Sequence, residues 1–156
     1  MRIDEYLFTK DTIALQVPAT DWKEAVARGV QLLEDAGAVG PGYYDAILAN
    51  VAAHGPYFVL VPGVAMPHAR PENGAWETSF SLVTLERPVD FGHADHDPVS
   101  VVLCVAAADH KALNQDVIAQ AMLLLGWGPF VERMREARTR QDIREIFECA
   151  AREEGD

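Results

Sequence analysis

A continuous apolar segment, VSVVLCVAA at positions 99–107, constrains the fold of this chain more than any other part of its sequence. The segment does not alternate between polar and apolar residues, and it is far shorter than the roughly 18 apolar residues that cross a bilayer. Strands whose two faces are both covered by helices have this pattern. The segment therefore predicts a central β-strand in a sheet that carries helices on both faces.

The rest of the chain predicts helices and strands in alternation. Further strand patterns occur at 12–17, 57–61 and 79–85, and helical patterns occur at 3–8, 21–37, 41–55 and 109–125, with two more beginning near 129 and 139. Helices before, between and after four or five strands are typical of an α/β layer structure with a mixed sheet. Because no linker or repeat interrupts the 156 residues, we expect a single domain over 1–156.

Charge and composition argue against several classes of partner. The chain has 13 basic and 24 acidic residues and a net charge of −11, so it is not expected to attract nucleic acid or an anionic membrane. The first ten residues include Asp4 and Glu5 and no apolar core, so we predict no secretion signal and a cytoplasmic location. Cys104 and Cys149 lack metal-ligand spacing, and both are expected to be buried free thiols.

One polar cluster has the residue types of a metal site. The segment GHADHDP contains His93, Asp95, His96 and Asp97, and such side chains bind divalent cations. A turn between two strands explains the same residues, because Asp and Gly favour turns. No second ligand cluster occurs at a suitable spacing, so the sequence favours the loop and we expect no metal.

A histidine stands at the end of a short apolar run in GVAMPHAR, positions 63–70. Pro67 fixes the backbone before it and removes a hydrogen-bond donor. Near neutral pH much of the imidazole of His68 is uncharged, which suits a nucleophile. The guanidinium of Arg70 matches phosphate oxygens. The pattern alone leaves two interpretations open, a phosphate-handling histidine and a surface histidine beside a turn.

The segment HGPYFVLVPGVAMPHARPENG, positions 54–74, resembles the active-site motif of the enzyme IIA components of the bacterial phosphoenolpyruvate-dependent sugar phosphotransferase system. It is similar to the mannitol–fructose superfamily and specifically to its ascorbate-type branch. YYDAIL at 43–48, LVTLERPVDF at 82–91 and DHDPV at 95–99 match as well, so the resemblance covers nearly the whole chain. It implies an α/β sandwich with a mixed five-stranded sheet flanked by helices, and a phosphorylated His68.

The resemblance also implies a mechanism and partners. A phosphohistidine of the carrier protein HPr would donate its phosphoryl group to His68, which would pass it to a cysteine of enzyme IIB during uptake of ascorbate, a related sugar acid or a pentitol. Backbone N–H groups near residues 68–70 and the side chain of Arg70 would neutralise the phosphoryl oxygens. No metal, nucleotide or other cofactor is implied, and neither cysteine of this chain takes part.

Two other functions stay open at this stage. One is a regulatory enzyme IIA whose phosphorylation state controls another protein, and the other is a non-catalytic binding domain with the same fold. The intact Pro67–His68 pair favours phosphoryl transfer over binding alone. The oligomeric state, including a homodimer, is also open, and no membrane insertion is expected.

The sequence departs from the family at its second active-site histidine. Near the expected place, on the helix after the central strand, stand Leu113 and Asn114, with His110 one turn earlier. His110 and Asn114 are four residues apart and share a helix face, so either could contact the phosphoryl group, and we rank His110 first. His54, at the end of the helix before the active-site segment, is a further candidate.

One surface would have to receive both HPr and enzyme IIB. We expect an apolar rim around His68 for this purpose. The candidates are the apolar residues nearest to it in sequence, namely Val64, Met66 and Trp76.

Overall fold

The predicted central strand is β5 (Val99–Ala106) in the computed structural model, which describes residues 2–155. All eight of its residues are buried. The sheet has five strands in the order β1-β4-β5-β3-β2, so β5 lies in the middle. The other strands are β1 (Ile13–Val17), β2 (Val59–Val61), β3 (Val64–Ala65) and β4 (Ser79–Val89). The expected mixed five-stranded sheet is confirmed.

Parallel and antiparallel pairings alternate across the sheet. β1 runs parallel to β4, β4 antiparallel to β5, β5 parallel to β3, and β3 antiparallel to β2. The parallel pairing of β3 with β5 matters most for function. Because parallel strands end at the same edge of a sheet, the chain segments that follow β3 and β5 leave the sheet side by side.

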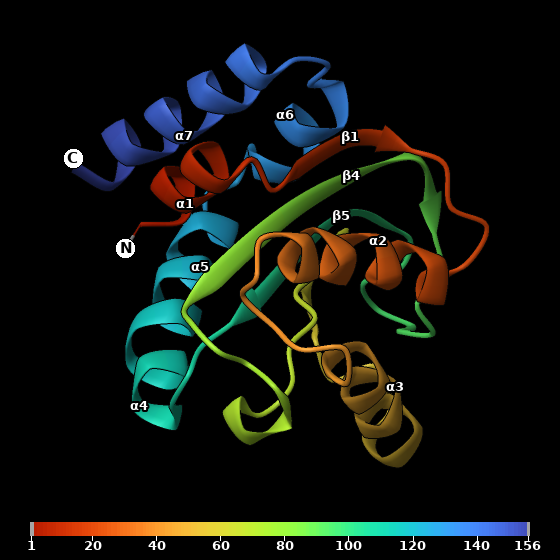
Figure 1. Cartoon of the computed structure of the whole chain (residues 1–156). Helices are drawn as coiled ribbons and strands as arrows, with labels where there is room; N and C mark the ends of the chain where they lie inside the picture. Colours follow the sequence, from red (N-terminus) through yellow and green to blue (C-terminus); the bar gives the residue numbers. More distant parts are fainter. Residues whose placement is uncertain (1, 156) are drawn as a thin grey trace.

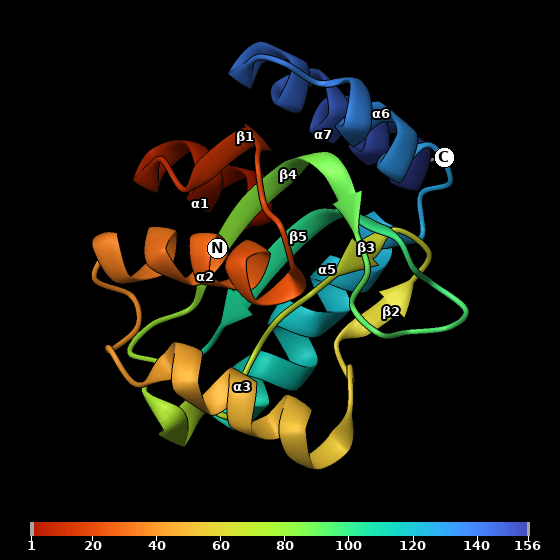
Figure 2. The same cartoon turned by 90° about the vertical axis from the view of Figure 1, so that its right-hand side faces the viewer.

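Helices cover both faces of the sheet, as the apolar pattern of β5 predicts (Figures 1 and 2). α2 (Trp22–Asp35) and α3 (Tyr43–His54) pack on one face. The other face carries α1 (Ile3–Lys10), α5 (Ile118–Leu125), α6 (Phe130–Glu136) and α7 (Arg140–Gly155). Each face therefore has its own apolar core, and β5 contributes side chains to both.

The helix predicted over 109–125 begins and ends where expected but is not regular. The carboxylate of Asp109 caps it by accepting the Ala112 N–H at 2.7 Å. A short α4 (His110–Ala112) leads into a wide π-helical turn, η2 (Leu113–Val117), before α5 begins. Such turns are rare and occur often at functional sites. This one contains Asn114.

The two cysteines differ in burial. Cys104 is fully buried in β5, and burial raises the pKa of its thiol to about 12, as expected for an inert core thiol. The corresponding expectation for Cys149 is wrong, because this residue is only half buried. Its sulfur accepts from the guanidinium of Arg152 at 3.2 Å. Within the described range, 2–155, no helix combines the length and apolarity that a membrane span requires.

Helix α2 lies so close to the sheet that Gly29 has no room for a side chain. A Cβ atom there would lie 2.4 Å from the sulfur of Cys104, and the Gly29 carbonyl accepts from the Ser81 hydroxyl at 2.8 Å. Real Cβ atoms essentially never come within 3.0 Å of such a neighbour. The close contact of Gly29 with Cys104 therefore sets the distance between α2 and β5.

Gly29→Ala should therefore lower the free energy of unfolding by about 1–3 kcal/mol, the usual cost of overpacking a core. This loss is expected although Ala is the better helix former by about 1 kcal/mol. Cys104→Ala removes the obstructing sulfur, so the double variant should lose less than the sum of the two single losses. Urea denaturation measures all three variants, with Gly128→Ala as control because a Cβ there meets nothing within 4 Å. Losses that add within about 0.5 kcal/mol would disprove the contact.

Candidate functional site

His68 follows β3 at the edge of the sheet where β5 also ends. The chain stays attached to β5 beyond β3, because the Val105 N–H donates to the carbonyl of Pro67 at 3.1 Å. On the other side, the Met66 N–H donates to the carbonyl of Phe58 at 2.8 Å. His110 begins the helix that follows β5. The parallel pairing thus brings the two predicted histidines to one edge.

The ring of His68 has a defined orientation. Its Nδ1 lies 2.8 Å from the carbonyl oxygen of Met66. A carbonyl oxygen only accepts, so Nδ1 carries the proton and the neutral ring has its lone pair on Nε2. Burial lowers the pKa of His68 below its ordinary value of 6.5, and the Met66 carbonyl opposes that shift in part. The imidazole is therefore neutral at pH 7 and has one nitrogen available as a nucleophile.

A pocket of about 510 Å³ surrounds this ring and brings together all the site residues that the sequence singles out. His54 comes from the end of α3, Arg70 from the segment after His68, and His110 and Asn114 from the helix after β5. The full lining is Asn50, His54, Tyr57, His68, Ala69, Arg70, His110, Leu113, Asn114 and Ile118. Residues separated by up to 68 positions in sequence therefore meet at one site.

His110 is already paired. Its Nε2 lies 2.9 Å from a carboxylate oxygen of Glu72, which belongs to the short 3₁₀ helix η1 (Pro71–Asn73). A hydrogen bond from the backbone N–H of Glu72 itself lowers the pKa of this carboxyl, and His110 lowers it further. The carboxylate is thus ionised at neutral pH and competes with any phosphoryl group for His110.

Another expected donor is also occupied. The Ala69 N–H, one of the backbone groups expected to bind phosphoryl oxygens, donates instead to the hydroxyl of Tyr43 at 3.0 Å. This N–H is therefore not available to a phosphoryl oxygen.

Sequence reasoning missed several residues of the site. Asn50 lines the pocket and lies one turn before His54 on the same helix, so an i, i+4 search from His54 could have found it. Tyr57 lies in a segment that the sequence predicts as a strand, and Glu72 lies in the turn that follows His68. Neither pattern indicates a site residue. Tyr43, the first residue of α3, is fully buried, and no pattern in the sequence links it to His68.

The prediction of an exposed apolar rim is wrong for two of its three residues. Val64 and Met66 are each 1% exposed, because the short strand β3 lies inside the sheet with helices over both faces. Trp76 is 61% exposed and its ring lies against Gly40, so it remains a candidate for partner contacts.

The loop of residues 93–97 has a structural explanation. The carboxylate of Asp97 accepts three backbone N–H groups, from Phe91, Gly92 and His93, at 2.8–2.9 Å. The rings of His93 and His96 stack with their centroids 4.4 Å apart. Asp97 therefore organises the turn, and in the part of the chain that the structure describes no three acidic, histidine or cysteine side chains are grouped to hold a metal.

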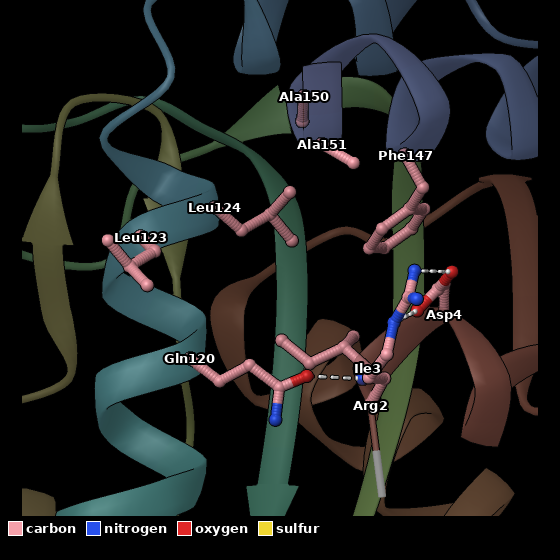
Figure 3. A pocket seen from close by; sticks show the side chains of 9 residues that line it. All are labelled: Arg2, Ile3, Asp4, Gln120, Leu123, Leu124, Phe147, Ala150 and Ala151. Atoms are coloured by element: carbon pink, nitrogen blue, oxygen red, sulfur yellow. Dashed lines mark hydrogen bonds and ion pairs between the residues drawn. The ribbon is translucent and has the colours of Figure 1, made fainter. Parts of the chain in front are cut away.

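A second pocket, of about 340 Å³, lies between α1, α5 and α7 (Figure 3). Its charged residues Arg2 and Asp4 bind each other, at 2.8 and 3.1 Å. The side chain of Gln120 accepts the Ile3 N–H at 2.6 Å and joins α5 to α1. The described lining contains no histidine, cysteine or serine. The pocket around His68, which is lined by three histidines and Arg70, is therefore the candidate functional site.

Comparisons with known proteins show the family of the chain. Residues 6–149 match the family described as "Phosphoenolpyruvate-dependent sugar phosphotransferase system, EIIA 2". The ascorbate-specific PTS system EIIA component of Shigella flexneri is 43% identical over 148 residues, which cover 95% of this chain and 96% of that protein.

Solved structures of enzyme IIA proteins have the same fold as this chain. A crystal structure from Streptococcus mutans, described as a PTS IIA (PtxA), has a TM-score of 0.89 at 39% identity and covers 96% of this chain and 95% of its own. The complex of enzyme IIA and phosphorylated enzyme IIB for mannitol from Escherichia coli has a TM-score of 0.77 at 22% identity. That match covers 88% of this chain and 94% of the other, and it shows a shared fold.

The lowered pKa of His68 predicts a pH dependence. Nitrogen-15 NMR of the imidazole should give a titration midpoint below 6.5 and a proton on Nδ1 in the neutral form. Because the unfolded chain then binds a proton more readily than the folded protein, stability should fall as the pH drops below about 6.5. His68→Asn should make this acid-side decline shallower. A midpoint above 6.5, or a proton mainly on Nε2, would contradict the geometry.

Proposed function

We propose that this chain, which belongs to the EIIA 2 family of the phosphoenolpyruvate-dependent sugar phosphotransferase system, accepts a phosphoryl group on Nε2 of His68 and then passes it on. One observation carries this proposal. The Met66 carbonyl holds the proton of His68 on Nδ1, so the nitrogen with the free lone pair belongs to a ring that lines the pocket.

The transfer needs no proton to leave the nucleophile. The lone pair of Nε2 attacks phosphorus, the phosphorus–nitrogen bond of the donor phosphohistidine breaks, and the donor ring keeps that electron pair. Positive charge then develops on the His68 ring, and the Met66 carbonyl stabilises it through Nδ1–H. Since the transition state of phosphoryl transfer is loose, the protein contributes mainly position and charge neutralisation.

Two partners follow from this chemistry. HPr is the proposed donor, and the cysteine thiolate of an enzyme IIB is the proposed acceptor, which releases neutral His68 for another cycle. Support for enzyme IIB comes from the mannitol enzyme of the same fold, which was solved as a complex with phosphorylated enzyme IIB. Arg70 and His54 lie in the pocket, where they are proposed to attract the phosphoryl dianion.

The proposed system is that of ascorbate. The curated relative with 43% identity over nearly the full chain is an ascorbate-specific component. The pocket around His68 handles a phosphoryl group rather than the sugar itself, so we infer that the choice of sugar is made through the enzyme IIB and permease that this chain serves. A cytoplasmic location fits those partners.

Incubation with phosphoenolpyruvate, enzyme I and HPr should add one phosphoryl group to His68. Mass spectrometry of the intact protein and its peptides detects the group, which should be lost in acid and kept in alkali, as expected for phosphohistidine. His68→Ala should abolish it, whereas His93→Ala, which changes a histidine outside the pocket, should not. A stoichiometric phosphoryl group on His68→Ala would refute the assignment.

Asn114 and His110 are the proposed donors to the phosphoryl oxygens. Glu72 changes their expected order, because His110 must release a carboxylate before it can bind a phosphoryl group. Asn114→Ala should therefore slow transfer by up to about a hundredfold, the typical effect of losing one oxyanion donor, and His110→Ala should slow it less. Single-turnover transfer from phospho-HPr gives the rates, with Gln115→Ala as the neighbouring control. If Glu72→Gln accelerates transfer and Asn114→Ala has no effect, His110 is the donor instead.

A further inference from the structure

The peptide group that joins His68 to Ala69 is held at both ends by tyrosine hydroxyls. The hydroxyl of Tyr57 donates to the carbonyl oxygen of His68. The Ala69 N–H donates to the hydroxyl of Tyr43 at 3.0 Å. Because the carbonyl and the N–H belong to one planar group, two hydrogen bonds from opposite sides fix the orientation of that plane.

Both tyrosines are themselves anchored. The hydroxyl of Tyr43 donates to the carbonyl of Val105 at 2.9 Å, so it connects the residue after His68 to the central strand. Tyr43 is fully buried, and burial raises the pKa of its phenol strongly, which keeps it a neutral donor. Tyr57 is hydrogen-bonded to the side chain of Asn50, which lines the same pocket. Burial also raises the pKa of the Tyr57 phenol.

The two tyrosines lie at opposite ends of one helix. Tyr43 is the first residue of α3, and Tyr57 lies three residues beyond His54, its last residue. Asn50 belongs to the same helix. The placement of the peptide after His68 therefore depends on α3 and on the segment that immediately follows it.

Tyr57 also contacts the reactive ring directly. Its ring meets the imidazole of His68 edge to face, with centroids 5.4 Å apart and an angle of 81° between the planes. The carbonyl of Met66, two residues earlier in the chain, is hydrogen-bonded to Nδ1 of the same ring. The ring and the peptide of His68 are thus both held by Tyr57, one by packing and the other by a hydrogen bond.

We propose that Tyr57 and Tyr43 are positioning residues for phosphoryl transfer, which together hold the His68 peptide so that Nε2 meets the incoming phosphorus without reorganisation. The inference rests on the proposed function of His68. Neither hydroxyl needs to touch the phosphoryl group. A group that is already in place when it reacts avoids the reorganisation that would otherwise slow the reaction.

Tyr57→Phe is the direct test, because it keeps the ring contact and removes only the hydroxyl. Tyr44→Phe is the matched control, since its hydroxyl donates to the Lys23 carbonyl at 3.1 Å and lies outside the pocket. Tyr57→Phe should lower the maximal single-turnover rate about tenfold, the rate equivalent of one neutral hydrogen bond. The phospho-HPr concentration at half-maximal rate should stay unchanged, because docking is not affected.

NMR of His68 gives a readout that does not depend on HPr. In the wild type and in Tyr44→Phe, the Nδ1–H proton should be protected and visible, whereas in Tyr57→Phe it should broaden through exchange with water. Purely structural anchoring predicts a different result, namely a lower melting temperature with a wild-type maximal rate and a wild-type imidazole spectrum. That result would overturn the proposal.

Tyr43→Phe and the double variant complete the test. Because both hydroxyls hold one peptide group, their effects on the maximal rate should be less than additive in free energy, whereas additive effects would contradict joint action. If wild-type protein accepts no phosphoryl group on His68, the proposed function fails. The imidazole spectrum of Tyr57→Phe then still decides whether Tyr57 positions the ring.

Discussion

The site depends on the parallel pairing of β3 with β5. This pairing continues past the end of β3 through the bond from Val105 to Pro67, and so it carries His68 to the edge at which the helix containing His110 and Asn114 begins. A shift in register by one residue would turn the side chain of His68 to the other face of the sheet. Burial of β5 on both faces opposes such a shift, because each of its apolar side chains already has a place in one of the two cores.

The electrostatics of the site are unusual for a protein with a net charge of −11. Under the proposed function, an acidic protein receives a dianionic group on a ring that is neutral rather than cationic. Arg70, His54 and His110 supply positive or ionisable groups around the pocket, and Glu72 counters one of them. The pocket is therefore locally favourable to an anion without being strongly basic. This balance suits a group that has to be released as readily as it is accepted.

The sequence predicted the layers and singled out His68 because both signals are local. The apolar run of β5 and the adjacent Pro67 and His68 can be read directly from neighbouring positions. The tyrosines that hold His68 could not be predicted in this way, since Tyr43 and Tyr57 reach its peptide group only through tertiary packing. Nearness in sequence was misleading for Val64 and Met66, which are close to His68 along the chain but are both buried in the core on the α1, α5, α6 and α7 face of the sheet. The partial exposure of Cys149 likewise depends on how α7 packs against α6, which a helical periodicity does not specify.

Each residue from Met66 to Ala69 has at least one backbone polar group engaged: Met66 with Phe58, Pro67 with Val105, His68 with Tyr57, and Ala69 with Tyr43. Surface loops that recognise partners often belong to the least stable parts of a protein and become ordered on binding. This segment is hydrogen-bonded to the central strand, so we expect it to open less readily than such loops. His68 is therefore held as part of the rigid body of the protein. Under the proposed function, two successive partners would meet the same preformed surface, and any adjustment during recognition would fall to side chains at the rim or to the partners themselves.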